Sequence, residues 1–421
     1  ADHWGIATNK GSSGAWRCVG HPASGVLSDL LLEKAAVRLK INPLALRRKI
    51  FLTEPLNQQN GQPYFSFGVR ECLEKAAELI GYSAKYHEAG ARTLPDGRLH
   101  GIGIHARCDG HGGMSGARGV IINMCEDGTV LFNSGGARNM GGPGGMGAVI
   151  AETLGVTYAQ CRCGDWGNTD VSAEGGSQGG STHTISQGAA AMVAAQDVKQ
   201  QLFAMAASSA TNMLKTTPDA LDAKDGKIFL IADPTKSVTH AQVMAAIAQP
   251  VIGRGVRWDP ILRKDVGTFK KGGPGVHKTG AACAVEVAVD PDTGHVEVLD
   301  YCNVLDFGRV IDRLGAEGQM VAGLQIEYNQ GIYWEDVYDP ITGVQMGYNH
   351  IHDRLCTSLD IPGDKNKIEF IETIDANGPY GCHGIAEPSV GKPCVFLNAV
   401  NNAIGKWIVT TPLTPRTILR A

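Results

Sequence analysis

Several patterns that would point to a function are missing from this sequence of 421 residues. No apolar run approaches the roughly 20 residues that a membrane-spanning helix needs, and the first residues do not form a signal peptide. The net charge of −4 and the absence of a basic cluster with interleaved aromatic residues argue against nucleic-acid binding. Neither Gly-x-Gly-x-x-Gly after a strand nor Gly-x4-Gly-Lys-Ser/Thr is present, which argues against a dinucleotide-binding fold and a P-loop.

Cysteine is present, but its spacing excludes the common clustered metal sites. The eleven cysteines include no Cys-x2-Cys pair for zinc and no Cys-x4-Cys-x2-Cys run for an iron–sulfur cluster. Their number is odd, and several lie in apolar strands such as residues 281–285, which indicates reduced thiols rather than a disulfide framework. We therefore expect a cytoplasmic protein with no membrane span.

Glycine is the residue in excess. The 55 glycines follow no triplet period, so a collagen helix is excluded and they must serve loops. Hydrophobic residues make up 43% of the chain and charged residues 19%, which is ordinary for a globular protein. The chain is longer than one average domain, and we expect two core-forming units.

The hydrophobic periodicity changes from helical to alternating and back along the chain, which predicts that the chain contains both helices and strands. The alternating segments 281–289 and 295–304 predict an antiparallel hairpin with one buried face. Helices are expected near residues 24–40, 43–51, 65–82, 146–154, 186–208, 240–248, 315–332 and 395–408, and strands near 101–107, 119–125, 129–133, 281–289, 295–304 and 367–373.

Two local patterns are specific enough to test. Leu27, Leu30 and Leu31 have helical spacing and predict an apolar face on the first helix. Thr239 and Gln242 form a capping-box pattern, which predicts that a helix begins between them.

Two glycine-rich segments, residues 134–145 and 175–184, each lead directly into a predicted helix. The first turn of a helix presents unpaired N–H groups and the positive end of the helix dipole, which suits phosphate or another oxygen-rich anion. A flexible connection is the alternative for each segment alone, but two such loops that both begin helices are harder to explain as linkers.

The segment 378–391 combines four glycines and two prolines around a single carboxylate, Glu387. Glycine permits close backbone approach to a ligand, and Pro388 favours an extended conformation at Glu387. This pattern can present one general base inside a pocket. A solvated glutamate in a turn before a helix is the alternative.

In their order along the chain, these segments resemble the xanthine oxidase family of molybdenum hydroxylases. The sequence Gly-Ile-Ala-Glu-Pro-Ser around Glu387 is similar to the family's Gly-x-x-Glu-Pro-Pro segment, and residues 15–22 are similar to its Ala-Phe-Arg-Gly-Phe-Gly-Gly-Pro loop. Further collinear similarities occur at residues 135–145, 179–182, 280–283, 306–308 and 317–323.

The resemblance implies the α+β fold of the xanthine oxidase and aldehyde oxidoreductase type, with mixed sheets and packed helices. It also implies hydroxylation of an electron-poor carbon, in an N-heteroaromatic compound or an aldehyde, with water as the oxygen source and Glu387 as the base. The cofactor implied is molybdenum-molybdopterin, in the cytosine dinucleotide form. The residues implied to bind the cofactor are Arg17, Gly141, Gly142, Gly179, Gly180, Ser181, Thr182 and Gln319, and those implied to contact the small-molecule substrate are Cys18, Val19, His111 and His383.

Three departures from the family pattern affect these expectations. Gly142 replaces a glutamine whose amide would bind the cofactor. Cys18 stands where most members have glycine, and carbon monoxide dehydrogenases have a copper-bridging cysteine at this place. The family's earlier Gly-Gly-Phe-Gly-Gly segment is absent, which implies that a second molybdopterin-binding subunit supplies it, as in split nicotinate dehydrogenases.

The resemblance therefore implies that residues 1–100 complete a first molybdopterin domain with a partner chain. Residues 101–421 are implied to form a second molybdopterin-binding region of two α+β lobes, divided near 215–280. A [2Fe-2S] subunit and an FAD subunit are the further partners implied, because this chain lacks cluster ligands. Two alternatives remain open: a carbon monoxide dehydrogenase-like molybdenum–copper enzyme, and a non-catalytic subunit that only completes a cofactor cage.

Overall fold

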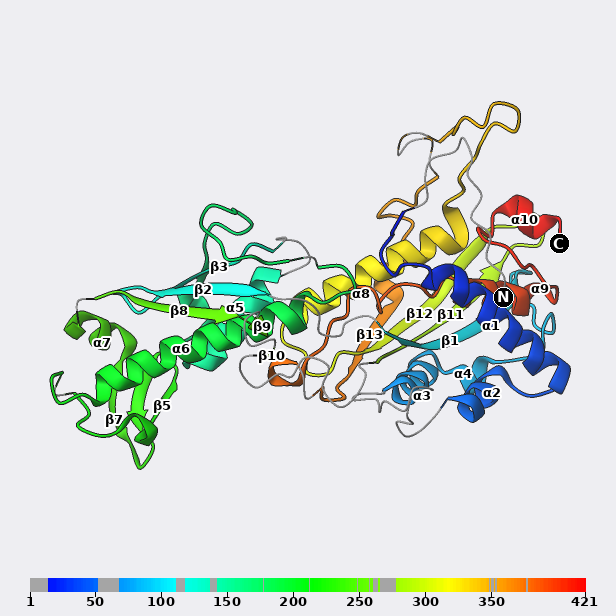
Figure 1. Ribbon diagram of the computed structural model, residues 1–421. Helices are drawn as coiled ribbons and strands as arrows, with labels where there is room; N and C mark the ends of the chain where they lie inside the picture. Colours follow the sequence, from blue (N-terminus) through cyan, green and yellow to red (C-terminus); the bar gives the residue numbers. More distant parts are fainter. Residues whose placement is uncertain are drawn as a thin grey trace.

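The computed structural model of this protein describes its residues in two lobes that lie side by side (Figure 1). Residues 118–256 form one, which we call the insert lobe; the described residues before and after it form the terminal lobe. The structure describes residues 14–51, 68–110, 118–136, 142–176, 178–211, 213–247, 249–256, 258–259, 264–265, 278–347, 349, 352, 354–375 and 378–421.

The terminal lobe is built on a four-stranded mixed sheet of order β1-β11-β12-β13. Neighbouring strands are antiparallel except β12 and β13, which are parallel. The strands are β1 (Leu99–Asp109), β11 (Thr279–Val289), β12 (Val296–Asp306) and β13 (Asn366–Ile371).

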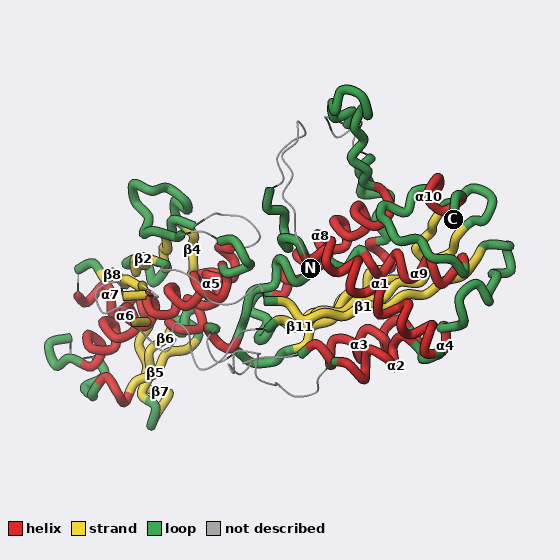
Figure 2. Tube along the Cα trace, turned by 45° about the vertical axis from the view of Figure 1, so that its right-hand side comes forward, coloured by secondary structure: helices red, strands yellow, loops and turns green. Residues whose placement is uncertain are grey.

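Helices cover both faces of this sheet (Figure 2), with α9 (Cys394–Ile404) on one face and α3 (Val69–Ile80) on the other. Along β11, Val285 contributes to the core beneath α9, whereas Ala284 contributes to the core beneath α3. The prediction that this hairpin buries one face is therefore wrong, because both faces of β11 are covered. At Gly101 a Cβ would lie 2.1 Å from the backbone oxygen of Ala399, so only glycine permits α9 to approach β1 this closely.

The first helix buries a different face from the one that the sequence predicts. Leu30 is buried, but Leu27 and Leu31 are 66% and 68% exposed. Its buried face instead contains Asp29 and Glu33, which form ion pairs with the fully buried Arg47. The remaining helices of the terminal lobe are α1 (His21–Leu39), α2 (Pro43–Ile50), α4 (Tyr82–Lys85), α8 (Arg313–Tyr328) and α10 (Pro415–Leu419), with short turns η4 (Asn329–Tyr333), η5 (Gly363–Lys365) and η6 (Pro379–Gly381).

The insert lobe contains a four-stranded sheet of order β4-β3-β2-β8 and a three-stranded sheet of order β5-β6-β7. Helix α6 packs on β8, and a Cβ at Gly255 would lie 1.9 Å from the backbone oxygen of Ala190. The strands are β2 (Gly119–Met124), β3 (Val130–Asn133), β4 (Cys161–Cys163), β5 (Leu221–Lys224), β6 (Lys227–Leu230), β7 (Asp233–Thr239) and β8 (Val251–Val256), and the short pair β9 (Trp258–Asp259) and β10 (Lys264–Asp265) follows them.

Helix α5 begins within the first glycine-rich segment, the turn η2 and helix α6 follow the second, and α7 begins at the predicted capping box. The capping box is confirmed, because Gln242 N–H donates to Thr239 Oγ1 at 3.1 Å and Thr239 N–H donates to Gln242 Oε1 at 2.7 Å. The helices are α5 (Gly142–Leu154), α6 (Gly188–Ala207) and α7 (His240–Ile247), with short turns η1 (Tyr158–Gln160), η2 (His183–Gln187) and η3 (Pro218–Ala220).

This arrangement confirms the α+β class with mixed sheets and packed helices. A search of the described residues finds no helix with the length and apolar character that crossing a membrane requires.

Candidate functional site

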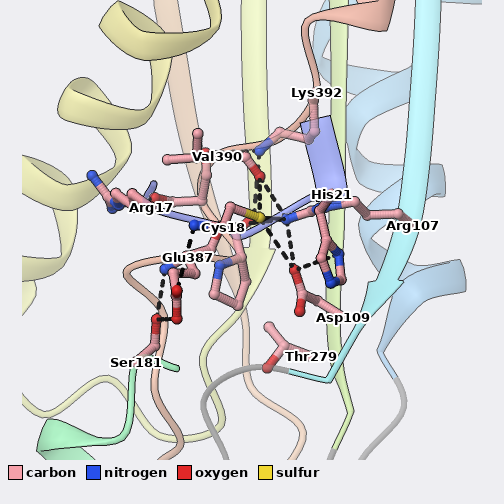
Figure 3. Close-up of polar contacts among 12 residues, drawn as sticks. Arg17, Cys18, His21, Arg107, Asp109, Ser181, Thr279, Glu387, Val390 and Lys392 are labelled. Atoms are coloured by element: carbon pink, nitrogen blue, oxygen red, sulfur yellow. Dashed lines mark hydrogen bonds and ion pairs between the residues drawn. The ribbon is translucent and has the colours of Figure 1, made fainter. Parts of the chain in front are cut away.

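Glu387 lies in the loop between η6 and α9 and is only 8% exposed, so the alternative of a solvated glutamate is wrong. Ser181 Oγ donates to Glu387 Oε2 at 3.0 Å and accepts a hydrogen bond from Glu387 N–H at 2.7 Å. The backbone N–H of Cys18 points at Glu387 Oε1 from 3.4 Å (Figure 3). Segments from three distant parts of the sequence thus fix the orientation of this carboxylate.

Three cationic side chains hold the backbone of the loop that contains Glu387. Arg17 Nε donates to the Ala386 oxygen at 2.5 Å, and Arg107 Nη2 donates to the Val390 oxygen at 2.5 Å. Lys392 Nζ donates to the Ser389 oxygen at 2.8 Å. Hydrogen bonds from charged donors are stronger than neutral ones, so the carbonyl groups on both sides of Glu387 are firmly positioned.

Lys392 is itself paired with an acid in the core of the terminal lobe. Its Nζ lies 2.9 Å from Glu327 Oε1, and both side chains are fully buried. The Tyr301 hydroxyl donates to the other oxygen of Glu327 at 2.7 Å. The positive charge below the loop is therefore balanced, as a buried charge requires.

Cys18 has a backbone φ of 72°, in the left-handed region that favours glycine. Its sulfur is fully buried, and Arg107 Nη2 donates to it at 2.9 Å. Burial raises the pKa of this thiol to about 11. The thiol contacts Arg107 and Asp109 (Figure 3) and is not part of the cavity wall described below.

Cys18, His21 and Asp109 are close enough together to suggest a metal site. However, Arg107 Nη2 lies 2.6 Å from Asp109 Oδ2 and also contacts the sulfur. A guanidinium already occupies the position of the cation, so these three residues do not form a favourable copper or zinc site.

A cavity of about 420 Å³ opens in front of Glu387, and both lobes contribute to its wall. Seven of the residues expected at the site line it: Arg17, Gly179, Gly180, Ser181, Gln319, His383 and Glu387. The cavity is also lined by residues that lie within the segments singled out in the sequence but were not named as site residues: Gly145, Gln178, His183, Thr184 and Phe307. Arg309 and Asp312 line it as well, and their position shortly after residues 306–308 was the only signal for them.

The glycine-rich turn before η2 forms one side of this cavity. Gly180 and Ser181 both have positive φ, at 78° and 60°. Thr182 Oγ1 donates to the Gly179 oxygen at 3.2 Å and accepts a hydrogen bond from Arg118 Nη2 at 3.4 Å. These two hydrogen bonds stabilise the turn.

On the opposite side, Arg17 Nη2 donates to Gln319 Oε1 at 3.0 Å. Burial lowers the pKa of Arg17 to about 10, so the guanidinium remains charged at neutral pH. The amide nitrogen of Gln319 and the guanidinium N–H groups of Arg17 that these bonds do not use can donate to a ligand.

His383 is also buried in the wall. Its Nε2 lies 3.3 Å from Asp306 Oδ1, and its Nδ1 lies 3.3 Å from Thr279 Oγ1. Burial alone would raise the pKa of Asp306, but hydrogen bonds from His383 and other neighbours hold it below its ordinary value. These contacts lock the ring in place.

Other expected residues lie away from the cavity wall. Val19 is 51% exposed, and Cys18, Thr182 and Gly142 are buried without lining the cavity. His111 and Gly141 lie outside the described residues.

Comparison with protein families identifies the chain. Residues 75–338, more than half of it, match the family model of the molybdopterin cofactor-binding domain. The chain belongs to the xanthine oxidase family of molybdopterin-binding proteins. This confirms the resemblance seen in the sequence.

This chain spans about half the length of the two relatives described next. The large subunit of nicotine 6-hydroxylase from Paenarthrobacter nicotinovorans is 26% identical over 99% of this chain and 52% of its own length. The putative xanthine dehydrogenase molybdenum-binding subunit from Escherichia coli K12 is 26% identical over 97% of this chain and 53% of its own length. The crystal structure of quinoline 2-oxidoreductase from Pseudomonas putida 86 shares the fold, with a TM-score of 0.81 at 22% identity over 97% of this chain and 52% of that one.

The residues of the cavity fit a molybdopterin cofactor. Among the described residues, the two clusters of potential metal ligands are Cys18, His21 and Asp109 in one and Asp29, His105 and Cys394 in the other, and neither lines the cavity. The described residues of the wall therefore contribute no three-ligand metal cluster of their own. The wall instead offers hydrogen-bond donors and exposed glycine backbone, which suit an oxygen-rich and nitrogen-rich ligand.

Proposed function

We propose that this chain is the catalytic, cofactor-binding part of a molybdenum hydroxylase. Its reaction oxidises an electron-poor carbon, in an N-heteroaromatic compound or an aldehyde, and takes the oxygen from water. The observation that supports this most directly is the buried Glu387 carboxylate in the cavity wall, oriented by Ser181 Oγ and by the N–H of Cys18.

In this proposal Glu387 is the general base that takes the proton from the water-derived nucleophile. A base must lie within hydrogen-bond reach of that proton, and a carboxylate fixed at the cavity wall meets this requirement. The bound molybdenum-pterin cofactor supplies the two-electron redox chemistry. The protein orients the reacting groups and limits the access of water.

We assign the cofactor-holding role to Arg17, Gln319 and the turn formed by Gly179, Gly180, Ser181 and Thr182. Arg17 and Gln319 contribute a charge and an amide donor on one side, and the turn presents backbone on the other. Gly142 remains part of the proposal through its position at the start of α5, and Gly141 remains part of it through the family resemblance alone. We extend it to the cytosine dinucleotide form, which nucleotide analysis after acid hydrolysis of the purified protein tests directly.

A second molybdopterin-binding subunit is the partner that the exposed surface supports. The chain spans about half the length of its relatives, and helix α1 exposes Leu27 and Leu31 close to the loop of Cys18. Large exposed apolar side chains that lie together mark protein–protein contacts. We further propose that a [2Fe-2S] subunit and an FAD subunit complete a cytoplasmic complex. All eleven cysteines are free thiols, which supports that location.

The partner proposal is tested with the double variant Leu27→Lys, Leu31→Lys in the natural complex. Two charges in an apolar interface should lower the amount of copurified partner by roughly tenfold or more. The control is Leu359→Lys, the same change at a leucine that is 95% exposed elsewhere on the terminal lobe. Purification of the wild-type chain alone, as a stable monomer with full molybdenum content, would refute the split-subunit proposal.

Neither alternative is favoured by a specific contact. A non-catalytic cage subunit has no need of a buried carboxylate oriented by two donors. For a molybdenum–copper enzyme, the Cys18 sulfur would have to leave Arg107 and reach the cavity. The decisive experiment is molybdenum and copper analysis of the purified complex, followed by metal reduction with a panel of N-heteroaromatic compounds and aldehydes. A complex without molybdenum would overturn the proposed function.

A further inference from the structure

His183 is a polar residue of the cavity wall that differs from its neighbours. It begins the short helix η2, and its ring is largely buried beside Trp166, with the ring centroids 5.9 Å apart. Neither ring nitrogen has a well-formed hydrogen bond among the described residues. By contrast, Ser181 is bonded to Glu387 and Arg17 to Gln319.

The position of this ring depends on Gly142. A Cβ at residue 142 would lie 2.6 Å from His183 Nε2, 3.1 Å from Cε1 and 3.3 Å from Cδ2. The Nε2 edge of the ring therefore packs directly against Gly142, and Nδ1 lies on the other side of Cε1. Any side chain at position 142 would force the imidazole to move.

The protonation state of the ring defines what it can bind. Burial, with a smaller effect of Arg118, lowers the pKa of His183 to about 4, and the nearby Gly142 backbone opposes this shift only in part. At neutral pH the imidazole is thus uncharged and can make directional hydrogen bonds without adding charge. Burial of a polar ring nitrogen without a well-formed hydrogen bond costs free energy, so the presence of this ring in a ligand cavity points to a partner on the ligand.

We propose that His183 is a further cofactor-binding residue, which hydrogen-bonds through Nδ1 to a polar atom of the ligand, and that Gly142 is required to leave room for its ring. This inference rests on the proposed function, in which the ligand is a molybdenum-pterin cofactor. It gives Gly142 an indirect role, since the residue acts by placing His183.

The test compares variants of His183 and Gly142 in the purified complex. His183→Phe keeps a ring and removes both nitrogens, whereas His183→Asn keeps a polar atom near the position of Nδ1. The readouts are molybdenum and pterin per chain, and the rate of molybdenum loss during incubation in metal-free buffer. Circular dichroism checks the fold of each variant.

We expect His183→Phe to release molybdenum roughly 2- to 10-fold faster, the range for one lost hydrogen bond, and His183→Asn to stay within about twofold of wild type. Gly142→Ala should release it as fast as His183→Phe. In the double variant the alanine should add nothing, because the ring that it displaces is already without nitrogen.

Wild-type molybdenum content and loss rate in His183→Phe would overturn the inference, as would fully additive effects of the two substitutions. If His183→Phe does not fold, His183→Ala provides the same comparison without added volume. A wild-type complex that contains no molybdenum would refute the proposed function itself, so the two failures are distinguishable.

Discussion

Replacement of Glu387 by glutamine tests the proposed mechanism most sharply. The variant keeps the size of the side chain and an oxygen that can accept from Ser181 Oγ or from the N–H of Cys18. The loop should keep its position, because its carbonyl groups are bound by Arg17, Arg107 and Lys392 rather than by the Glu387 side chain. What the amide cannot do is take a proton.

The expected loss follows from this difference. Removal of a general base typically lowers the rate by about 10²–10⁴-fold, which corresponds to roughly 3–5 kcal/mol in activation free energy. The described donors to the carboxylate, Ser181 Oγ and the N–H of Cys18, are neutral and can also donate to an amide oxygen. Folding stability and molybdenum content should therefore stay close to wild type.

The assay is the rate of molybdenum reduction by a substrate in a stopped-flow experiment, with each protein normalised to its molybdenum content. Glu78→Gln is the matched control, because Glu78 is exposed on α3 and forms only a surface pair with Lys75. A Glu387→Gln variant that reduces its molybdenum as fast as wild type, at equal loading, would refute the assignment of Glu387 as the base.

Three further predictions follow from the contacts around the site. Gly180→Leu places a branched side chain at a φ of 78° in the cavity wall, so the molybdenum content per chain should fall while the circular dichroism spectrum stays unchanged. A variant with the full molybdenum content would exclude this turn from the cofactor site. Lys392→Met removes the cationic partner of the buried Glu327 and should lower the free energy of unfolding by about 3–5 kcal/mol. The second substitution Glu327→Gln should restore most of this stability, and a double variant without any recovery would contradict the pairing. Because burial raises the pKa of Cys18 to about 11, iodoacetamide at pH 8 should leave it unmodified in the native protein and label it after unfolding; this thiol's contribution to stability should be complete below about pH 9 and lost as the pH rises toward 11. Rapid native labelling of Cys18, detected by mass spectrometry, would contradict its burial.

The sequence predicts the positions of helices and strands better than it predicts which of their faces are buried. Periodicity locates α6, β11 and β12 and the capping box of α7, since these depend on local spacing. It does not predict that α1 turns Leu27 toward solvent and buries Asp29. That orientation depends on Arg47, a residue on another helix that pairs with the buried acids.

In the candidate site, the sequence likewise predicts which residues come together but not the direction of every side chain. Motif order brings Arg17, Ser181, Gln319 and Glu387 to one cavity, although they come from segments up to 370 residues apart in sequence. Spacing contains no information about the direction of the Cys18 thiol, because the positive φ of this residue turns it toward Arg107. His183 lies within a glycine-rich segment that the sequence analysis singled out. Its packing against Gly142 is seen only in the structure.

The arrangement of charge around Glu387 separates two requirements that a base must meet together. The residue has to be held rigidly, and strong hydrogen bonds from cations do this best; yet a cation bound to the carboxylate itself would stabilise the ionised form and weaken the base. Here the cations bind the carbonyl groups of Ala386, Ser389 and Val390, while a hydroxyl and a backbone amide contact the carboxylate. Among the described contacts, rigidity thus comes from the backbone of the loop, and neutral donors orient the carboxylate.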